Sequence, residues 1–327
     1  MKLRHLPILC GLAAMSLFSA FAQAQSFPSK PLTLAVAVPP GGALDFIARL
    51  LSREMSASLG QPIIVENNPG AGGTLGTNKA MKAPADGYTM MLSSPTEVIL
   101  APLNYNAAQY KAEDLRTIRI VGHTGLMVVV RKGLAAGNLA ELVALMKANA
   151  DKPLTFCSPG NGSLYHLVAE KLSATGGVKS VHVPYSGFPQ CMTDLIGGNV
   201  DFAVLPLAGP FPGAVDSGGI RAIAMLSNVP STRLPKVPLA SATKGFEGFA
   251  FSVWSAVHVN GKVPDAVAEL LNQHVNAALA KPEVRTAIEQ SGAGVSPSMT
   301  LKQAQDEYQK EVALYTAMFK AIGLSKQ

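Results

Sequence analysis

Two short loops rich in glycine and proline carry the residues best suited to hold an anion. Residues 38–45 read Val-Pro-Pro-Gly-Gly-Ala-Leu-Asp and residues 157–163 read Cys-Ser-Pro-Gly-Asn-Gly-Ser, each between an apolar stretch and an amphipathic one. Glycine allows a tight turn with outward-facing amides, and the following helix adds unpaired N–H groups at the positive end of its dipole. Two such loops facing each other across a cleft could hold a carboxylate without an arginine.

Asp45 is a carboxylate next to the first candidate anion site, and Glu97 is an acid that follows the apolar stretch ending at Leu92. Asp45 falls in the first turn of the predicted helix, where its charge suits the helix dipole and Arg49 can pair with it. A structural role for Asp45 is therefore favoured over direct contact with a ligand ammonium group. Glu97 has two possible roles: facing the cleft it would favour a ligand with an amino or other donor group, and facing solvent it would have no effect.

Other chemistries fit the sequence less well. The glycine-rich stretch 69–76 lacks the spacing of a dinucleotide or phosphate loop, so a structural loop at the rim of a cleft is the better interpretation. Ser163 and His166 could serve a secreted hydrolase, but no G-x-S-x-G motif surrounds the serine. The histidines outside the N-terminal segment show no metal-ligand spacing, and neither a metal nor a cofactor is expected. These histidines are His123, His166, His182, His258 and His274.

The N-terminus has the pattern of a secretory signal peptide. Lys2 and Arg4 precede an apolar run over residues 6–21, and the small-x-small sequence of residues 22–24 predicts cleavage near Ala24. A membrane anchor is the competing interpretation, but the run is short for a span. We therefore expect a soluble product exported to the periplasm.

Charge and cysteine content narrow the possible partners. The formal net charge is +6. It falls to +4 once the positive Lys2 and Arg4 leave with residues 1–24, and it is not gathered into a basic run. Nucleic acid is therefore not an expected partner, and a monomer is expected. Cys157 and Cys191 remain after cleavage, and they are expected either to pair in an oxidising compartment or to stay as buried thiols.

The hydrophobic pattern alternates between strands and helices, which predicts α/β architecture with mainly parallel sheets. One set of elements runs through residues 32–92 and a second through 127–226, followed by a strand near 249–259 and a helical tail. About 300 mature residues exceed what one core usually serves. We expect domain one over residues 25–124 and 252–327, domain two over residues 125–251, and a hinge between them.

Several motifs resemble those of the Bug family of periplasmic solute receptors. They include Pro39-Pro40-Gly41-Gly42 with Asp45, the stretch 65–73, residues 85–89, and Gly160-Asn161-Gly162-Ser163 with His166. Further matches follow in order at residues 183–185, 194–198 and 234–238, so the resemblance covers essentially the whole mature chain.

The resemblance implies a two-domain, type II-like Venus-flytrap binding protein rather than an enzyme. It implies delivery of carboxylated solutes to the membrane components of a tripartite tricarboxylate transporter, with one ligand carboxylate held by main-chain amides of residues 41–45. A ligand-sensing partner of a signalling receptor would use the same binding chemistry. Tyr165 stands where small polar residues are common in the family, and Phe188 follows Ser186-Gly187. These two aromatic residues favour a bulkier, di- or aromatic carboxylate.

Taken together, the loops and the resemblance predict a set of ligand-binding residues. These are Pro40, Gly41, Gly42, Ala43, Asp45, Phe46, Ser93, Ser94, Thr96, Ser158, Asn161, Gly162, Ser163, His166, Tyr185, Phe188 and Asp201.

Overall fold

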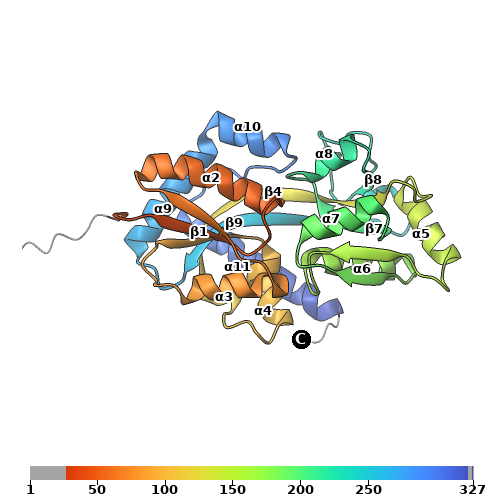
Figure 1. Ribbon diagram of the computed structural model, residues 1–327, viewed down its shortest axis with the longest axis horizontal. Coiled ribbons are helices and arrows are strands. Elements are labelled where there is room, and N and C mark those ends of the chain that lie inside the picture. Colours follow the sequence, from red (N-terminus) through yellow and green to blue (C-terminus); the bar gives the residue numbers. More distant parts are fainter. Residues whose placement is uncertain (1–26, 323–325, 327) are drawn as a thin grey trace, which may run out of the picture.

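The protein folds into two α/β lobes that share long central strands (Figure 1). The computed structural model describes residues 27–322 and residue 326; the predicted signal peptide, residues 1–24, lies outside the described residues. In Figure 1 the first lobe contains the red-to-orange and blue segments, and the second contains the yellow-green to cyan segments. This arrangement confirms the predicted α/β fold class.

The sheet of the first lobe begins with three parallel strands. β1 (Leu32–Val36) lies between β2 (Ile63–Asn67) and β3 (Thr89–Ser93). β9 (Ser252–Asn260) pairs antiparallel with β3 and with β4 (Leu115–Arg131). The apolar residues of β1 and β3 are almost fully buried, as expected for strands covered by helices on both faces.

The sheet of the second lobe repeats this plan. β5 (Thr155–Ser158) runs parallel to β6 (Val181–Pro184) and to β7 (Phe202–Pro206). β7 and β8 (Ile220–Met225) each pair antiparallel with β4. Each lobe therefore has a parallel core of three strands extended by antiparallel neighbours.

β4 begins twelve residues earlier than the strand that was predicted from Met127. Its first part carries Arg116, Arg119 and His123, which interrupt the apolar pattern. Arg119 is nonetheless buried, because its guanidinium donates to Asn276 Oδ1 at 2.7 Å and to carbonyls of a distant segment. β4 pairs with β9 as far as Gly125 and with β7 and β8 beyond it. This change supports a boundary near 124/125, but the domain limits remain predictions.

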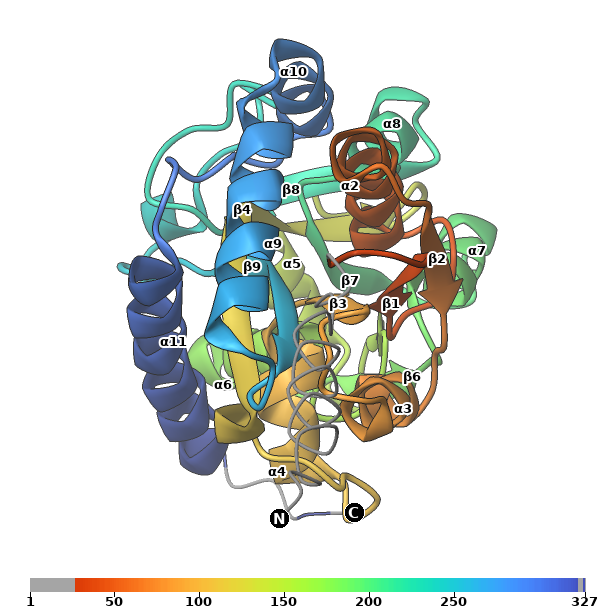
Figure 2. The same ribbon diagram turned by 90° about the vertical axis from the view of Figure 1, so that its left-hand side faces the viewer.

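Helices cover both faces of each sheet (Figures 1 and 2). In the first lobe, α2, α9 and α10 share one apolar core, while α3 and α11 contribute to another. Their bounds are α2 Ala43–Leu59, α3 Thr74–Lys82, α9 Asp265–Ala280, α10 Pro282–Gln290 and α11 Leu301–Ile322. The C-terminal helices pack onto earlier elements of the first lobe: α9 and α11 contact β4, and α10 contacts α2.

The second lobe is covered by α5 and α6 on one face and by α7 and α8 on the other. Their bounds are α5 Leu139–Ala148, α6 Leu164–Gly176, α7 Phe188–Gly197 and α8 Phe211–Asp216. The helix α8 and the two turns η3 (Thr96–Leu100) and α4 (Ala101–Asn104) were not predicted from the sequence, because they are too short for a helical period to stand out. Among the described residues, none of the helices is both long and apolar enough to cross a bilayer.

Candidate ligand-binding site

A cavity of about 570 Å³, including its solvent-open mouth, lies between the two lobes. The segments that follow β1, β3 and β5 reach the cavity, and so does the last residue of β7, Pro206. This agrees with the rule that open α/β sheets bind ligands beyond the carboxyl ends of their strands. The lining residues of the cavity are Ala37, Val38, Pro39, Gly42, Ala43, Leu44, Gly72, Gly73, Ser94, Thr96, Glu97, Pro159, Tyr165, Ser186, Gly187, Phe188, Pro189 and Pro206.

The N-terminus of α2 opens onto this cavity. Gly42 precedes the helix in an extended conformation, and its carbonyl accepts the first helical hydrogen bond from the Phe46 amide at 3.0 Å. The amides of Ala43 and Leu44 have no acceptor within the helix, because the helix begins at Ala43. Since Gly42, Ala43 and Leu44 all line the cavity, the positive end of the α2 dipole is available to an anionic ligand.

Asp45 lies behind this turn and supports it. Its Oδ2 accepts hydrogen bonds from the Gly41 amide and from Arg49 Nε, both at 3.0 Å, and its Oδ1 accepts from Asn67 Nδ2 at 3.0 Å. Burial by itself raises the pKa of Asp45, but hydrogen bonds from Arg49, Gly41 and Asn67 outweigh it and bring the pKa below its usual value. Asp45 is therefore engaged within the first lobe and does not line the cavity.

Other residues predicted in the first lobe also lie outside the lining. Pro40 and Gly41 are exposed, and Phe46 packs against the core that α2 shares with α9 and α10. Ser93 is fully buried at the end of β3. Ser94 and Thr96, one and three residues farther on, do line the cavity.

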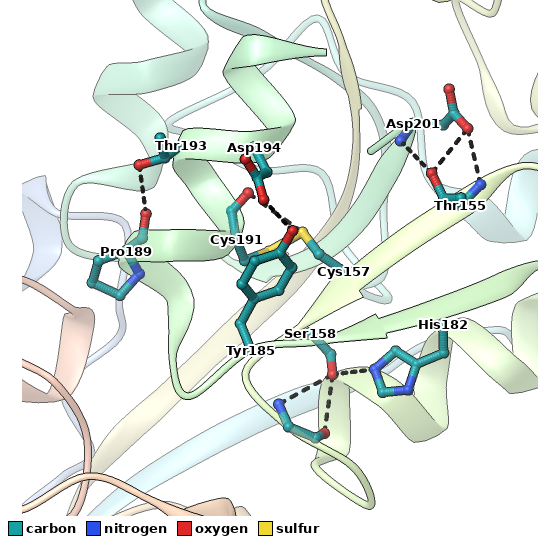
Figure 3. The surroundings of a disulfide bond; sticks show 11 residues. Thr155, Cys157, Ser158, His182, Tyr185, Pro189, Cys191, Thr193, Asp194 and Asp201 are labelled. Atoms are coloured by element: carbon teal, nitrogen blue, oxygen red, sulfur yellow. Dashed lines mark hydrogen bonds between the residues drawn. A yellow bond between two sulfur atoms is a disulfide. The ribbon is translucent and has the colours of Figure 1, made fainter. Parts of the chain in front are cut away.

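The polar groups of the second glycine loop are bonded to the loop itself and to neighbouring elements. Ser158 Oγ donates to the Gly160 carbonyl at 3.0 Å and lies 2.6 Å from His182 Nε2 (Figure 3). Burial, and secondarily the nearby His166, lower the pKa of His182 to about 3, so this imidazole is neutral at physiological pH. Of the residues 157–163, Pro159 alone is part of the described lining.

Ser163 and His166 do not form a nucleophile and base pair. The Ser163 hydroxyl accepts from the His166 backbone amide at 3.3 Å and so caps the N-terminus of α6. The His166 ring Nδ1 accepts from the Gly162 amide at 3.0 Å and stacks on the His182 ring. Both side chains stabilise the loop that precedes α6.

This loop also contacts the first lobe directly. The Asn161 carbonyl accepts from Asn104 Nδ2 at 3.0 Å and from the Tyr105 hydroxyl at 2.9 Å. The Leu164 amide donates to Thr96 Oγ1 at 3.3 Å. Gly162, with φ +66°, is required at the contact, since a Cβ there would lie 2.5 Å from the Asn104 side chain.

Tyr185 and Asp201 also have partners away from the lining (Figure 3). The Tyr185 hydroxyl donates to the carboxylate of Asp194 in α7. Asp201 precedes β7, at the opposite end of that strand from Pro206, which does line the cavity. Its carboxylate accepts from Arg131 Nε and from the Thr155 amide, both at 2.9 Å.

The cavity walls include residues that were not among the predicted site residues. Tyr165 packs edge-to-face against the predicted Phe188, with ring centroids 4.6 Å apart. The sequence predicted Tyr165 to favour a bulky ligand and predicted the loop containing Gly72 and Gly73 to lie at the rim of a cleft. The other missed residues are Ala37, Val38, Pro39, Leu44, Pro159, Ser186, Gly187, Pro189 and Pro206, most of which carry little chemical signal of their own.

Glu97 faces the cavity, which answers the question that the sequence left open. Its side chain is buried, and its Oε2 accepts hydrogen bonds from the Ser94 amide at 2.6 Å and the Ser94 hydroxyl at 2.7 Å. Burial raises the pKa of Glu97 to about 7.

Cys157 and Cys191 form a disulfide, so the first of the two alternatives for these cysteines is the one observed (Figure 3). The bond ties the end of β5 to the first half of α7. Across the described part of the chain, no group of three or more His, Cys, Asp or Glu residues is placed to hold a metal ion.

The molecule has two α/β lobes joined by shared strands, and a cavity lies at the ends of their parallel strands. This architecture is that of a periplasmic binding protein. The chain matches the TctC family, described as the tripartite tricarboxylate transporter family receptor, over residues 47–324. It belongs to this family, which confirms the resemblance found in the sequence. The family is one of solute-binding receptors and not of enzymes.

Individual relatives agree with this assignment. Protein BugT of Bordetella pertussis is 35% identical over 294 residues, which cover 88% of this chain and 89% of BugT. The solved structure of the periplasmic binding protein BugD superimposes with a TM-score of 0.85 at 29% identity, over 92% of this chain and all of that one. MatC of Rhodopseudomonas palustris with bound malate has a TM-score of 0.83 at 25% identity, over 90% of this chain and all of that one.

Proposed function

We propose that this protein is an exported receptor that captures a small carboxylate between its lobes and delivers it to the membrane components of a tripartite transporter. The observation that carries the proposal is the N-terminus of α2, whose free amides open onto a cavity with no lysine or arginine among its described lining residues. The bound malate of MatC supports the same ligand chemistry.

The energetics of such a site are sufficient for solute capture. A hydrogen bond to a charged group contributes about 1.5–3 kcal/mol. Three or four of them, less the cost of closing the lobes, give micromolar binding at about 8 kcal/mol. Loss of the signal segment 1–24 would release the receptor into the periplasm, where it would act as a monomer and use no cofactor.

The aromatic pair Tyr165 and Phe188 supports a ligand of some bulk, so di- and aromatic carboxylates are the first compounds to test. Because a ligand that binds the folded state raises its melting temperature, a thermal-shift screen of mono-, di- and aromatic carboxylates identifies candidates. Measuring uptake of the identified ligand in cells with and without the receptor then distinguishes delivery to a transporter from a role in signalling.

The amide site is tested with Gly42→Val. Gly42 has a φ of −87°, and a Cβ added there meets nothing closer than the Pro39 carbonyl at 3.9 Å, so the variant should fold. Its branched side chain would cover the amides, and we expect binding to be lost in titration calorimetry while the thermal melt is unchanged. Gly213→Val, in open space on α8, is the matched control. Unchanged affinity of Gly42→Val would refute the proposed carboxylate site.

A further inference from the structure

Glu97 is a carboxyl group inside a cavity whose main anchor is suited to another carboxylate. Among the described lining residues it is the one acidic side chain. It is 4% exposed, and the two hydrogen bonds from Ser94 hold its Oε2 in place. The carboxyl group is therefore a built part of the cavity wall.

The neighbouring glycine turn makes room for this side chain. Gly73 has a φ of +90°, and a Cβ at that position would lie 2.5 Å from Glu97 Cγ. Any other residue at position 73 would therefore displace Glu97. The glycine at position 73 of the rim loop therefore allows the Glu97 side chain to lie in the cavity wall.

Within the described residues, no cation neutralises Glu97. The groups that favour its ionised form are hydrogen-bond donors from Ser94 and from its own backbone, with no lysine, arginine or histidine of the described chain among them. An ionised carboxylate that is buried without a counter-charge is costly. A ligand group that is positively charged and donates hydrogen bonds would remove this cost.

We propose that Glu97 determines specificity by binding the ammonium group of an aminocarboxylate whose carboxylate is held at the N-terminus of α2. This inference rests on the proposed function and narrows its ligand class to zwitterions. A simple dicarboxylate held at the same anchor would bring its second carboxylate toward Glu97, and the two like charges would repel each other.

The titratable groups that face Glu97 from the elements packed against it are tyrosines. The Tyr110 hydroxyl donates to the Glu97 carbonyl, and Tyr165 of α6 lies across the cavity with Tyr315 of α11 near it. Burial raises the pKa of all three tyrosines far above neutrality, so they remain uncharged. Near neutral pH, Glu97 is therefore the group on this wall whose charge changes.

The two ligand classes should then respond to pH in opposite directions. An ammonium group requires ionised Glu97, so aminocarboxylate affinity should fall roughly thirtyfold from about pH 8.5 to about pH 5.5, given a carboxyl group that titrates at about 7. A dicarboxylate requires protonated Glu97 and should bind more tightly as the pH falls.

The experiment is titration calorimetry of the mature protein with two matched panels. One contains the α-amino acids, 4-aminobutyrate and 5-aminopentanoate, and the other contains malate, succinate and glutarate. We expect Glu97→Gln to lower the affinity of the best aminocarboxylate at least tenfold at about pH 8.5 and to abolish its pH dependence. Glu269→Gln, at an exposed position on α9, is the control and should match the wild type.

The outcomes separate this inference from the proposed function. The role of Glu97 is overturned if the wild-type protein prefers dicarboxylates at every pH, or if Glu97→Gln leaves the aminocarboxylate affinity unchanged. Either result leaves the receptor function standing. Failure of every compound in both panels to bind overturns this inference, and the proposed function falls with it only if the mono- and aromatic carboxylates of the thermal-shift screen also fail to bind. If Glu97→Gln does not fold, the opposite pH responses of the wild-type protein still decide the question.

Discussion

At the scale of single residues, Asp45 shows how a carboxylate can stand next to an anion site without repelling the anion. Its two oxygens accept hydrogen bonds from Arg49, Asn67 and the Gly41 amide, and the residue is 4% exposed. The Arg49 guanidinium offsets its charge at 3.0 Å. The carboxylate therefore stiffens the turn that presents the α2 amides.

We expect Asp45→Asn to lower the free energy of unfolding by about 1–3 kcal/mol at neutral pH, because hydrogen bonds to a charged group are lost. The pKa of Asp45 is lowered on folding from its ordinary 3.8. Its stabilising contribution is therefore fully present above that value and is lost as the pH falls through the folded-state pKa.

Urea denaturation of wild type and Asp45→Asn across this pH range measures the effect. The difference between the two proteins should shrink below about pH 4, with exposed Asp151→Asn as the control. A difference that stays constant with pH would show that the ionised carboxylate is not what stabilises the turn.

At the scale of elements, the disulfide joins two segments that both lead into the cavity. Cys157 lies two residues before Pro159, and Cys191 lies in the helix that begins with Phe188. Both Pro159 and Phe188 line the cavity. The crosslink thus holds the start of α7 against the end of β5.

Replacing both cysteines by alanine should lower the free energy of unfolding by about 2–4 kcal/mol, since the unfolded chain regains the freedom of a loop with 34 residues of separation. Ligand affinity should also fall, because the start of α7 loses its tether. Chemical denaturation and calorimetry check both effects, and wild type kept in reductant should behave like the variant. Equal stability of the oxidised wild type and the variant would contradict the prediction.

At the scale of the whole molecule, hydrogen bonds between the lobes close the cavity. Asn104, Tyr105 and Thr96 of the first lobe bind backbone groups at the start of α6. Ligand capture in a two-lobed protein depends on the free energy of this closed arrangement. The contacts therefore contribute to affinity without touching the ligand.

Tyr105→Phe removes one such bond and keeps the ring. A neutral hydrogen bond contributes about 0.5–1.5 kcal/mol, so we expect affinity to fall about two- to tenfold. The control is Tyr88→Phe, whose hydroxyl bonds to Ser29 within the first lobe. Calorimetry gives the affinity, and small-angle scattering reports compaction on ligand binding. An equal effect of both variants would argue against closure as the cause.

Much of the fold and part of the site could be predicted from local pattern. Apolar strands followed by glycine turns and amphipathic stretches predicted the α/β units, and the α2 turn was recognised because a helix N-terminus has the same chemistry in any context. The first half of β4 was missed, since the partners of Arg119 come from residues 276–297. The internal bonding of the loop at residues 158–163 was missed for the same reason: Ser158 pairs with His182 of a neighbouring strand.

The sequence by itself determined the alternation of elements, the family and the amide-rich turn at the start of α2, because each depends on neighbours within a few residues. Only the tertiary structure decided that Cys157 and Cys191 pair and that Asp201 lies away from the cavity while Glu97 faces it. The physical reason is that the direction and partners of a side chain depend on elements far apart in sequence, which come together only when the two lobes are assembled.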